Sequence, residues 1–200
     1  MPVRSILCIR HGESTFNAAW RAACVDPLHF DAPLTEDGHR QVREARTALH
    51  ERPVELVITS PLTRALQTAT GLFEGHPNRP RYLVAHLARE RLENSCDQGR
   101  APALLARDFP ALDFTALANV WWHTDEAPDH RGISLEPVEH VEKRAAEFRR
   151  FLHARPERCI AVVAHGTFLR HLTGRSFANC EVVELDLATS EAGSSHAGPA

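Results

Sequence analysis

Short apolar runs recur along the chain, and most of them stop abruptly at charged residues, glycine or proline. Their length and their content of β-branched residues are typical of buried strands. The last run alternates apolar and polar positions, as an edge strand does. The predicted strands are Ser5–Ile9, Glu55–Ser60, Arg81–His86, Cys159–Ala164 and Glu181–Leu187.

Segments with helical periodicity lie between these runs. Thr35 is expected to cap one of them, because two acidic residues follow it in the first turn. Ser60 is expected to cap another, with Pro61 at the first helical position. Strands that alternate with helices predict an α/β fold, a three-layer α/β/α sandwich with a mainly parallel sheet. The predicted helices are Ser14–Ala23, Thr35–His50, Leu62–Phe73, Val138–His153 and His165–Leu172.

The stretch 91–137 breaks this alternation, because prolines interrupt its short helical pieces and Trp121-Trp122 stands among polar residues. It is too short and too polar to form a hydrophobic core of its own. We interpret it as a small cap inserted into a single domain of residues 1–188, with the tryptophans packing the cap onto the core. Residues 189–200 are rich in Ser, Gly and Ala, which predicts a disordered tail.

Composition narrows the range of partners. The 200 residues carry a net charge of −3, so no basic field is expected to hold nucleic acid or an anionic membrane. No apolar run reaches membrane-spanning length, and the N-terminus lacks a signal-peptide pattern, which makes the cytoplasm the expected compartment. The five cysteines are odd in number and contain no CxxC pair, which favours a reducing compartment over a disulfide framework.

Thirteen histidines raise the question of a metal site. The nearest cluster in the sequence combines His123 and Asp125 with Asp129-His130, in an irregular polar stretch. No HExxH motif occurs. We interpret this stretch as a solvated loop, and we expect the protein to bind neither a metal nor a cofactor.

Cations, imidazoles and a carboxylate follow four of the predicted strands. These residues are Arg10-His11, Ser60 with Arg64, Arg89-Glu90 and His165-Gly166. Ligands of open α/β sheets bind outside the carboxyl ends of the strands, so we expect these side chains to share one site. Arginines can fork onto the oxygens of a phosphoryl group. A neutral imidazole can attack phosphorus, and a glutamic acid can protonate the leaving oxygen.

At these positions the sequence resembles the histidine phosphatase superfamily, in its phosphoglycerate-mutase-like branch. The resemblance extends from Val3 to about Leu187. It rests on Arg10-His11-Gly12-Glu13-Ser14 with Asn17, on Ser60-Pro61-Leu62-Thr63-Arg64-Ala65 with Gln67-Thr68, on Arg89-Glu90, and on Val162-Val163-Ala164-His165-Gly166.

The resemblance implies a metal-independent phosphatase that hydrolyses small phosphomonoesters. It implies that His11 is the nucleophile and becomes a phosphohistidine, and that Glu90 donates the proton to the leaving group. Glu93, one helical turn further on, is the alternative donor. Glu13 and Ser14 are expected to be scaffold residues. The implied phosphate pocket consists of Arg10, Asn17, Arg64 and His165.

Two other activities stay open. The stretch 89–100 lacks the Glu-Arg-x-Tyr-Gly sequence of the cofactor-dependent phosphoglycerate mutases, which favours a phosphatase over a mutase. Phosphohistidine phosphatases that act on proteins are smaller and lack a cap, which counts against the third alternative. Some arginines of the cap could meet further anionic groups of a substrate, although solvated surface positions are the interpretation we prefer for each. These arginines are Arg91, Arg100, Arg107 and Arg131.

Overall fold

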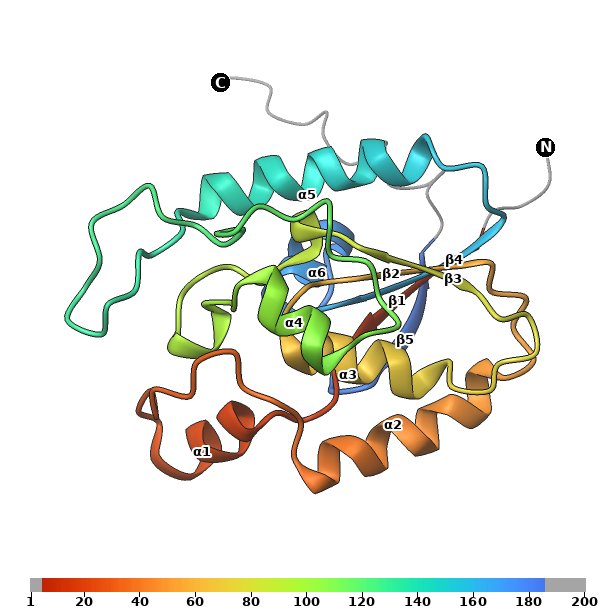
Figure 1. Cartoon of the computed structure of the whole chain (residues 1–200), viewed down its shortest axis with the longest axis horizontal. Coiled ribbons are helices and arrows are strands. Elements are labelled where there is room, and N and C mark those ends of the chain that lie inside the picture. Colours follow the sequence, from red (N-terminus) through yellow and green to blue (C-terminus); the bar gives the residue numbers. More distant parts are fainter. Residues whose placement is uncertain (1–4, 186–200) are drawn as a thin grey trace, which may run out of the picture.

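The computed structural model describes residues 5–185, and the tail expected at 189–200 lies outside this range. One five-stranded sheet, in the order β3-β2-β4-β1-β5, crosses the middle of the molecule (Figure 1). Only β5 runs antiparallel to its neighbour, at the edge beside β1. The strands are β1 (Ser5–Arg10), β2 (Leu56–Thr59), β3 (Arg81–Val84), β4 (Cys159–Ala164) and β5 (Val182–Leu185).

Local capping explains where several helices begin and end. Ser14 caps α1 by accepting a hydrogen bond from the N–H of Asn17, and Thr35 caps α2 by accepting one from Gly38. Gly174 ends α6 in the left-handed conformation. The helices are α1 (Thr15–Ala23), α2 (Glu36–Leu49), α3 (Thr63–Leu72), α4 (Pro102–Asp108), α5 (Val138–His153) and α6 (Gly166–Thr173), with short 3-10 turns η1 (His86–Ala88) and η2 (Ser95–Asp97).

The start of α3 corrects one prediction. Pro61 does not begin the helix, and Ser60 does not cap it, because its hydroxyl accepts a hydrogen bond from Leu62 in the preceding turn. The N-terminus of α3 is instead covered by Asp31, whose carboxylate accepts the N–H of Thr63 at 2.7 Å. A carboxylate from a distant loop thus supplies the negative charge that a helix N-terminus favours.

The pleat of the sheet divides its side chains between two helical layers (Figure 1). In β1, Ile6 and Cys8 pack with α5 and α6, whereas Leu7 and Ile9 pack with α2 and α3. The central strands β2 and β4 are buried along their whole length and alternate in the same way. The three-layer α/β/α sandwich with a mainly parallel sheet is therefore confirmed.

Residues 91–137, here called the insert, lie between β3 and α5 in the chain. The insert buries its apolar residues against α3 and β3, where Leu105 and Phe114 pack with Leu66 and Val84. Trp121 is 5% exposed, and its indole N–H donates to the carbonyl oxygen of Arg100 at 2.9 Å. The expected packing role of this tryptophan is confirmed.

Two global features agree with the composition. All five cysteines are free thiols, and every one except Cys24 is buried. Within residues 5–185, no helix combines the length and the apolar character that crossing a lipid bilayer requires.

The sheet topology brings two histidines together. β1 and β4 are parallel neighbours, and Arg10 is paired with Ala164 in register, so His11 and His165 leave the sheet side by side. The chain continues from β1 to α2 on one face of the sheet, and from β4 to α6 on the other face. Connections that diverge in this way open a crevice at the carboxyl ends of the two strands, where α/β proteins bind their ligands.

Candidate active site

His11 lies at the carboxyl end of β1 with only 3% of its surface exposed. Its Nδ1 is 2.6 Å from the carbonyl oxygen of Gly12. Because a carbonyl only accepts, Nδ1 carries the proton and Nε2 carries the lone pair. Burial, together with the positive charges of Arg64 and Arg10, holds the pKa of His11 well below its ordinary value. The ring is therefore neutral at pH 7, with a nucleophilic nitrogen at Nε2.

Close backbone packing fixes the turn that carries this histidine. A Cβ atom at Gly12 would lie 2.8 Å from the carbonyl oxygen of Gly38, so a larger residue does not fit without a backbone shift. The N–H of Gly12 donates to the hydroxyl of Thr68 at 3.0 Å, and that hydroxyl donates to the carbonyl of Arg64 at 2.7 Å. The β1 turn and the first turns of α3 are thus hydrogen-bonded to each other.

Glu13 and Ser14 make the contacts expected of scaffold residues. The carboxylate of Glu13 accepts a hydrogen bond from Thr35 at 2.8 Å and forms an ion pair with Arg21. Ser14 and Asn17 form a capping box, in which the side-chain oxygen of Asn17 accepts the N–H of Ser14 at 3.1 Å. Since that oxygen is engaged, the predicted phosphate contact of Asn17 would have to use its NH₂ group.

His165 follows β4, and its ring centroid lies 5.1 Å from that of His11. It is fully buried, and neither ring nitrogen has a hydrogen-bond partner among the described residues. Burial and the charge of Arg64 lower its pKa well below the ordinary value. Arg10 donates from Nη1 to the carbonyl of Phe177 at 2.8 Å, but its buried Nε also lacks a partner within residues 5–185. Buried polar atoms without partners are rare, and a bound anion would accept hydrogen bonds from Nε of Arg10 and from the protonated ring nitrogen of His165.

Arg64 contacts the predicted nucleophile directly, because its Nε donates to Nε2 of His11 at 3.2 Å. The side chain is 2% exposed and also binds Cys96 and Asp97 of the insert. Burial alone would lower the pKa of Arg64, but the acidic groups around it, Asp97 and Glu90 among them, raise it. A permanent cation therefore lies against the lone pair of His11 and keeps that imidazole unprotonated.

Glu90 follows η1 and reaches the N-terminus of α6, where its carboxylate accepts the N–H groups of Thr167 and Phe168, each at 2.9 Å. Its negative charge raises the pKa of Arg10, against the larger lowering by burial. The side chain of Glu93 is 51% exposed and pairs with a neighbouring arginine at 3.3 Å. The geometry thus brings Glu90, and not Glu93, to the strand ends.

The segment that carries Glu90 is held by two buried charges that the sequence pattern did not single out. Arg144 donates to the carbonyl oxygens of Leu87 at 3.0 Å and Arg89 at 2.6 Å. Glu136 accepts from Arg144 at 2.9 Å and is 1% exposed. An arginine on the otherwise apolar face of α5 is the signal in the sequence that marks such a role.

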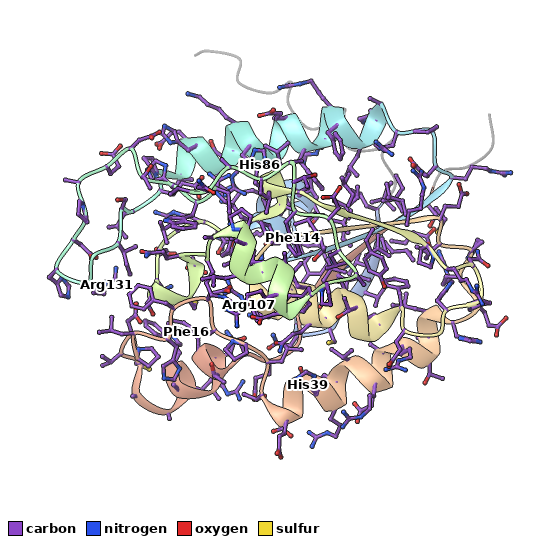
Figure 2. The ribbon with its side chains drawn as sticks, viewed as in Figure 1. Phe16, His39, His86, Arg107, Phe114 and Arg131 are labelled. Atoms are coloured by element: carbon purple, nitrogen blue, oxygen red, sulfur yellow. The ribbon has the colours of Figure 1, made fainter. Side chains whose placement is uncertain are left out.

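Two arginines of the insert form ion pairs with buried carboxylates. Arg100 binds the buried carboxylate of Asp31 at 2.6 Å, and Arg131 binds Asp26 at 2.9 Å. Figure 2 shows Arg131 on the outer loop of the insert and Arg107 on α4, where Arg107 is exposed. Arg100 and Arg131 therefore tie the insert to the loop between α1 and α2 rather than standing as solvated surface residues.

Two of the predicted site residues, Arg10 and Glu90, line a small polar cavity of about 240 Å³, together with Gly166 and Thr167. A larger hollow of about 570 Å³ lies between α2 and α3, and none of the predicted site residues lines it. Arg43 and Arg46 line that hollow, but none of the strand-end residues does, so the volume of a cavity does not by itself identify the site.

A group of possible metal ligands lies elsewhere, in the insert. His123 and Asp125 come close to His140 of α5, and one donor atom of each lies within 4.8 Å of the others. Asp129, which the sequence grouped with them, instead binds Arg131 at 2.8 Å. Nδ1 of His123 lies 4.0 Å from Oδ2 of Asp125, whereas a zinc ion with bonds of about 2.0–2.1 Å needs donors roughly 3.3 Å apart. This arrangement does not identify a metal centre.

Comparison with known proteins is consistent across sequence and structure. The sequence model of the histidine phosphatase superfamily (branch 1) matches residues 6–190. A phosphoglycerate mutase-like protein of Arabidopsis thaliana is 29% identical over 88% of this chain and 76% of its own. A Schizosaccharomyces pombe protein named as a probable phosphatase is 27% identical over 84% of this chain and 76% of its own. Mycobacterial glucosyl-3-phosphoglycerate phosphatase shares the fold, with a TM-score of 0.56, 23% identity and coverage of 90% and 92% of the two chains.

Proposed function

Because the chain belongs to the histidine phosphatase superfamily, branch 1, we propose that it hydrolyses phosphomonoesters of small molecules through a phosphohistidine on His11. The observation that carries this proposal is the state of His11. Its Nδ1–H is held by the carbonyl of Gly12, so the lone pair on Nε2 faces the guanidinium of Arg64. A neutral nucleophile beside cations is what attack on a phosphoryl group requires.

In the first step, Nε2 of His11 attacks phosphorus, and the bond between phosphorus and the ester oxygen breaks. Glu90 gives a proton to that oxygen. The phosphorylated ring keeps its proton on Nδ1, where the Gly12 carbonyl stabilises the positive charge that develops. Arg10 and Arg64 supply N–H donors to the phosphoryl oxygens, and His165 donates from a ring nitrogen that has no protein partner among the described residues.

In the second step, the carboxylate of Glu90 takes a proton from a water molecule, which attacks phosphorus. The bond between phosphorus and Nε2 breaks, inorganic phosphate leaves, and His11 returns to its neutral form. No metal ion is needed for charge balance in this scheme, because the two guanidinium groups supply the positive charge.

The pairing of the insert arginines supports a phosphatase over a mutase. A mutase has to bind a second anionic group of its substrate while the phosphoryl group is transferred. Arg100 and Arg131 are bound to internal carboxylates, and Arg91 pairs with Glu93 and donates to the carbonyl of Glu136. Cations that are already neutralised are poor receptors for a further anion.

Trapping the phosphoenzyme tests the proposal. Rapid acid-free quench with radiolabelled p-nitrophenyl phosphate should yield an acid-labile, alkali-stable label located on His11 by mass spectrometry. The variant His11→Ala should lose both the label and about 1000-fold or more of kcat. An unlabelled enzyme that still turns over, or a His11→Ala variant with full activity, contradicts the mechanism.

Two further assays choose between the activities. A screen over sugar phosphates, phosphoglycerates, nucleotides and phosphopeptides reports the substrate class, with His11→Ala as the background. Interconversion of 2- and 3-phosphoglycerate, measured with and without bisphosphoglycerate, should stay below phosphate release. Interconversion faster than phosphate release would identify a mutase instead.

A further inference from the structure

The guanidinium of Arg64 is fixed from two sides. Nε donates to Nε2 of His11 at 3.2 Å, whereas Nη1 donates to the carbonyl oxygen of Cys96 at 2.5 Å and Nη2 to Oδ1 of Asp97 at 2.8 Å. A guanidinium has five N–H groups, so one N–H on each Nη atom is still available to a phosphoryl oxygen. The sheet supplies one anchor of this cation, and the insert supplies the other two.

Asp97 is built to hold this position. It is 4% exposed, and it ends the short turn η2, in which its Oδ2 accepts the backbone N–H of Asn94 at 3.0 Å. The turn is anchored on its far side by Asp26, which accepts the hydroxyl and the N–H of Ser95. Both oxygens of Asp97 are therefore hydrogen-bonded, one to its own turn and one to the cation.

Resting on the phosphohistidine function proposed above, we propose that Asp97 is a positioning residue for that reaction. It orients the guanidinium of Arg64 so that Nε lies against the nucleophilic nitrogen of His11 while the free N–H groups point to the substrate. The insert thereby acts on the chemistry through one buried carboxylate. Its arginines have no part in this step.

The buried ion pair gives this arrangement its strength. Arg64 and Asp97 are both shielded from water, so their attraction is weakly screened, and loss of the carboxylate leaves a buried cation without its counter-charge. An arginine released in this way can rotate away from His11, for example toward Glu90. Phosphate would still bind a cation there, but the cation would no longer be aligned with the attacking nitrogen.

Protonation of Asp97 should have the same effect as its removal. Burial raises its pKa to about 6, Arg64 opposes this shift, and Glu90 adds to it. The charged and titratable groups that face it are Arg64 on α3, Glu90 after η1 and the thiol of Cys96 in its own turn. As the pH falls through about 6, the carboxylate is neutralised and its hold on Arg64 weakens.

The test compares Asp97→Asn with the wild type and with Arg64→Ala, alone and combined. We expect Asp97→Asn to lower kcat about tenfold or more with little change in KM, because ground-state binding of phosphate is kept. In the Arg64→Ala background the same substitution should change kcat less than about twofold, since its effect passes through Arg64. Additive losses would overturn the positioning role.

The pH profile provides a readout that a merely structural role would not move. The kcat/KM of wild type should fall as the pH drops below about 6. In Asp97→Asn, the part of this fall that comes from the enzyme should be absent. The ionisation of the phosphate ester itself, with a pKa of about 6, is common to both proteins and cancels in the comparison. Asp97→Glu, which keeps the charge but displaces it, should have a lower kcat and still show the fall in kcat/KM at acid pH. Identical profiles for wild type and Asp97→Asn contradict the proposal.

Asp26→Asn is the matched control, because Asp26 anchors the same turn without touching Arg64. Its kcat should stay within about twofold of wild type, and a loss equal to that of Asp97→Asn would assign the effect to the placement of the turn. Binding of orthovanadate separates this proposal from the proposed function. If wild type forms no phosphoenzyme, the function fails. The role of Asp97 then stands only if the substitution Asp97→Asn alters vanadate affinity when Arg64 is present and leaves it unchanged in the Arg64→Ala background.

Discussion

The strand ends and the insert differ in whether their buried polar and charged groups have partners within the protein. At the strand ends, both ring nitrogens of His165 and the Nε of Arg10 are buried without partners among the described residues. In the insert, arginines bind carboxylates of the loop between α1 and α2, as in the Arg100–Asp31 and Arg131–Asp26 pairs, although Nε2 of His123 is also buried without a partner among the described residues. Unsatisfied polar atoms destabilise a fold, so they persist where a ligand will satisfy them. The difference supports the proposal that the strand ends receive the phosphate, whereas Arg100 and Arg131 tie the insert to the loop between α1 and α2.

The largest effect that sharpens this contrast is expected at Glu90. The two carboxylate oxygens of Glu90 accept the N–H groups of Thr167 and Phe168 separately, so the variant Glu90→Gln keeps an acceptor for one of them, and it cannot donate and recover a proton in the two steps. We expect kcat with an alkyl phosphate, whose leaving group needs a proton, to fall about 100-fold. An activated ester such as p-nitrophenyl phosphate should show a smaller loss in its first step.

Glu93→Gln is the control for this experiment, since Glu93 differs from Glu90 by one helical turn in sequence and is 51% exposed in its side chain. Its kcat should stay within about twofold of wild type. If Glu93→Gln were the more damaging substitution, the assignment of the proton donor and the contrast between strand end and insert would both be wrong.

The strand-end site is predictable because its signals are local in the sequence. An apolar run followed by Arg10-His11, and another followed by His165-Gly166, identify both the strand and the edge of the sheet at which it ends. Parallel register then places the two histidines side by side. The same reasoning predicted α5 and β4 with the bounds that the structure shows.

The contacts that irregular segments make with α3 are not predictable in this way. Asp97 meets Arg64 across 33 residues of sequence, and Asp31 covers the start of α3 across 32 residues. Neither pairing leaves a periodic signal, because an irregular segment has no repeat that fixes which side chains point inward. Sequence-based reasoning therefore assigned the cap of α3 to the adjacent Ser60 and gave Asp97 no role.

Acid stability should reveal the buried histidines of the strand ends. His11 and His165 have pKa values held well below the ordinary 6.5 in the fold by burial, whereas the unfolded chain binds protons normally. As the pH falls below about 6.5, the unfolded state takes up protons that the folded state does not, so folding stability is lost. Each histidine contributes about 1.4 kcal/mol per pH unit.

Urea unfolding at pH 7, 6 and 5 measures this slope. His165→Gln should be less sensitive to acid than wild type by the contribution of one histidine, and carboxylates that titrate in the same range cancel in the difference. The exposed residue His39, which Figure 2 shows on α2, provides the control substitution His39→Gln. Equal slopes for His165→Gln and wild type would mean that His165 is not held neutral by the fold.

The smallest effect on activity is expected in the insert itself. Arg131→Ala removes the ion pairs with Asp26 and Asp129, which are partly open to solvent, so the free energy of unfolding should fall by only about 1 kcal/mol. Because these carboxylates already neutralise Arg131, kcat/KM for a small phosphomonoester should change less than about twofold. Steady-state kinetics and urea unfolding of the same preparation check both numbers. A tenfold rise in KM confined to substrates with a second anionic group would show that Arg131 exchanges its internal partners for the substrate. The insert would then select substrates by binding their second anionic group, and the contrast with the strand ends would no longer hold.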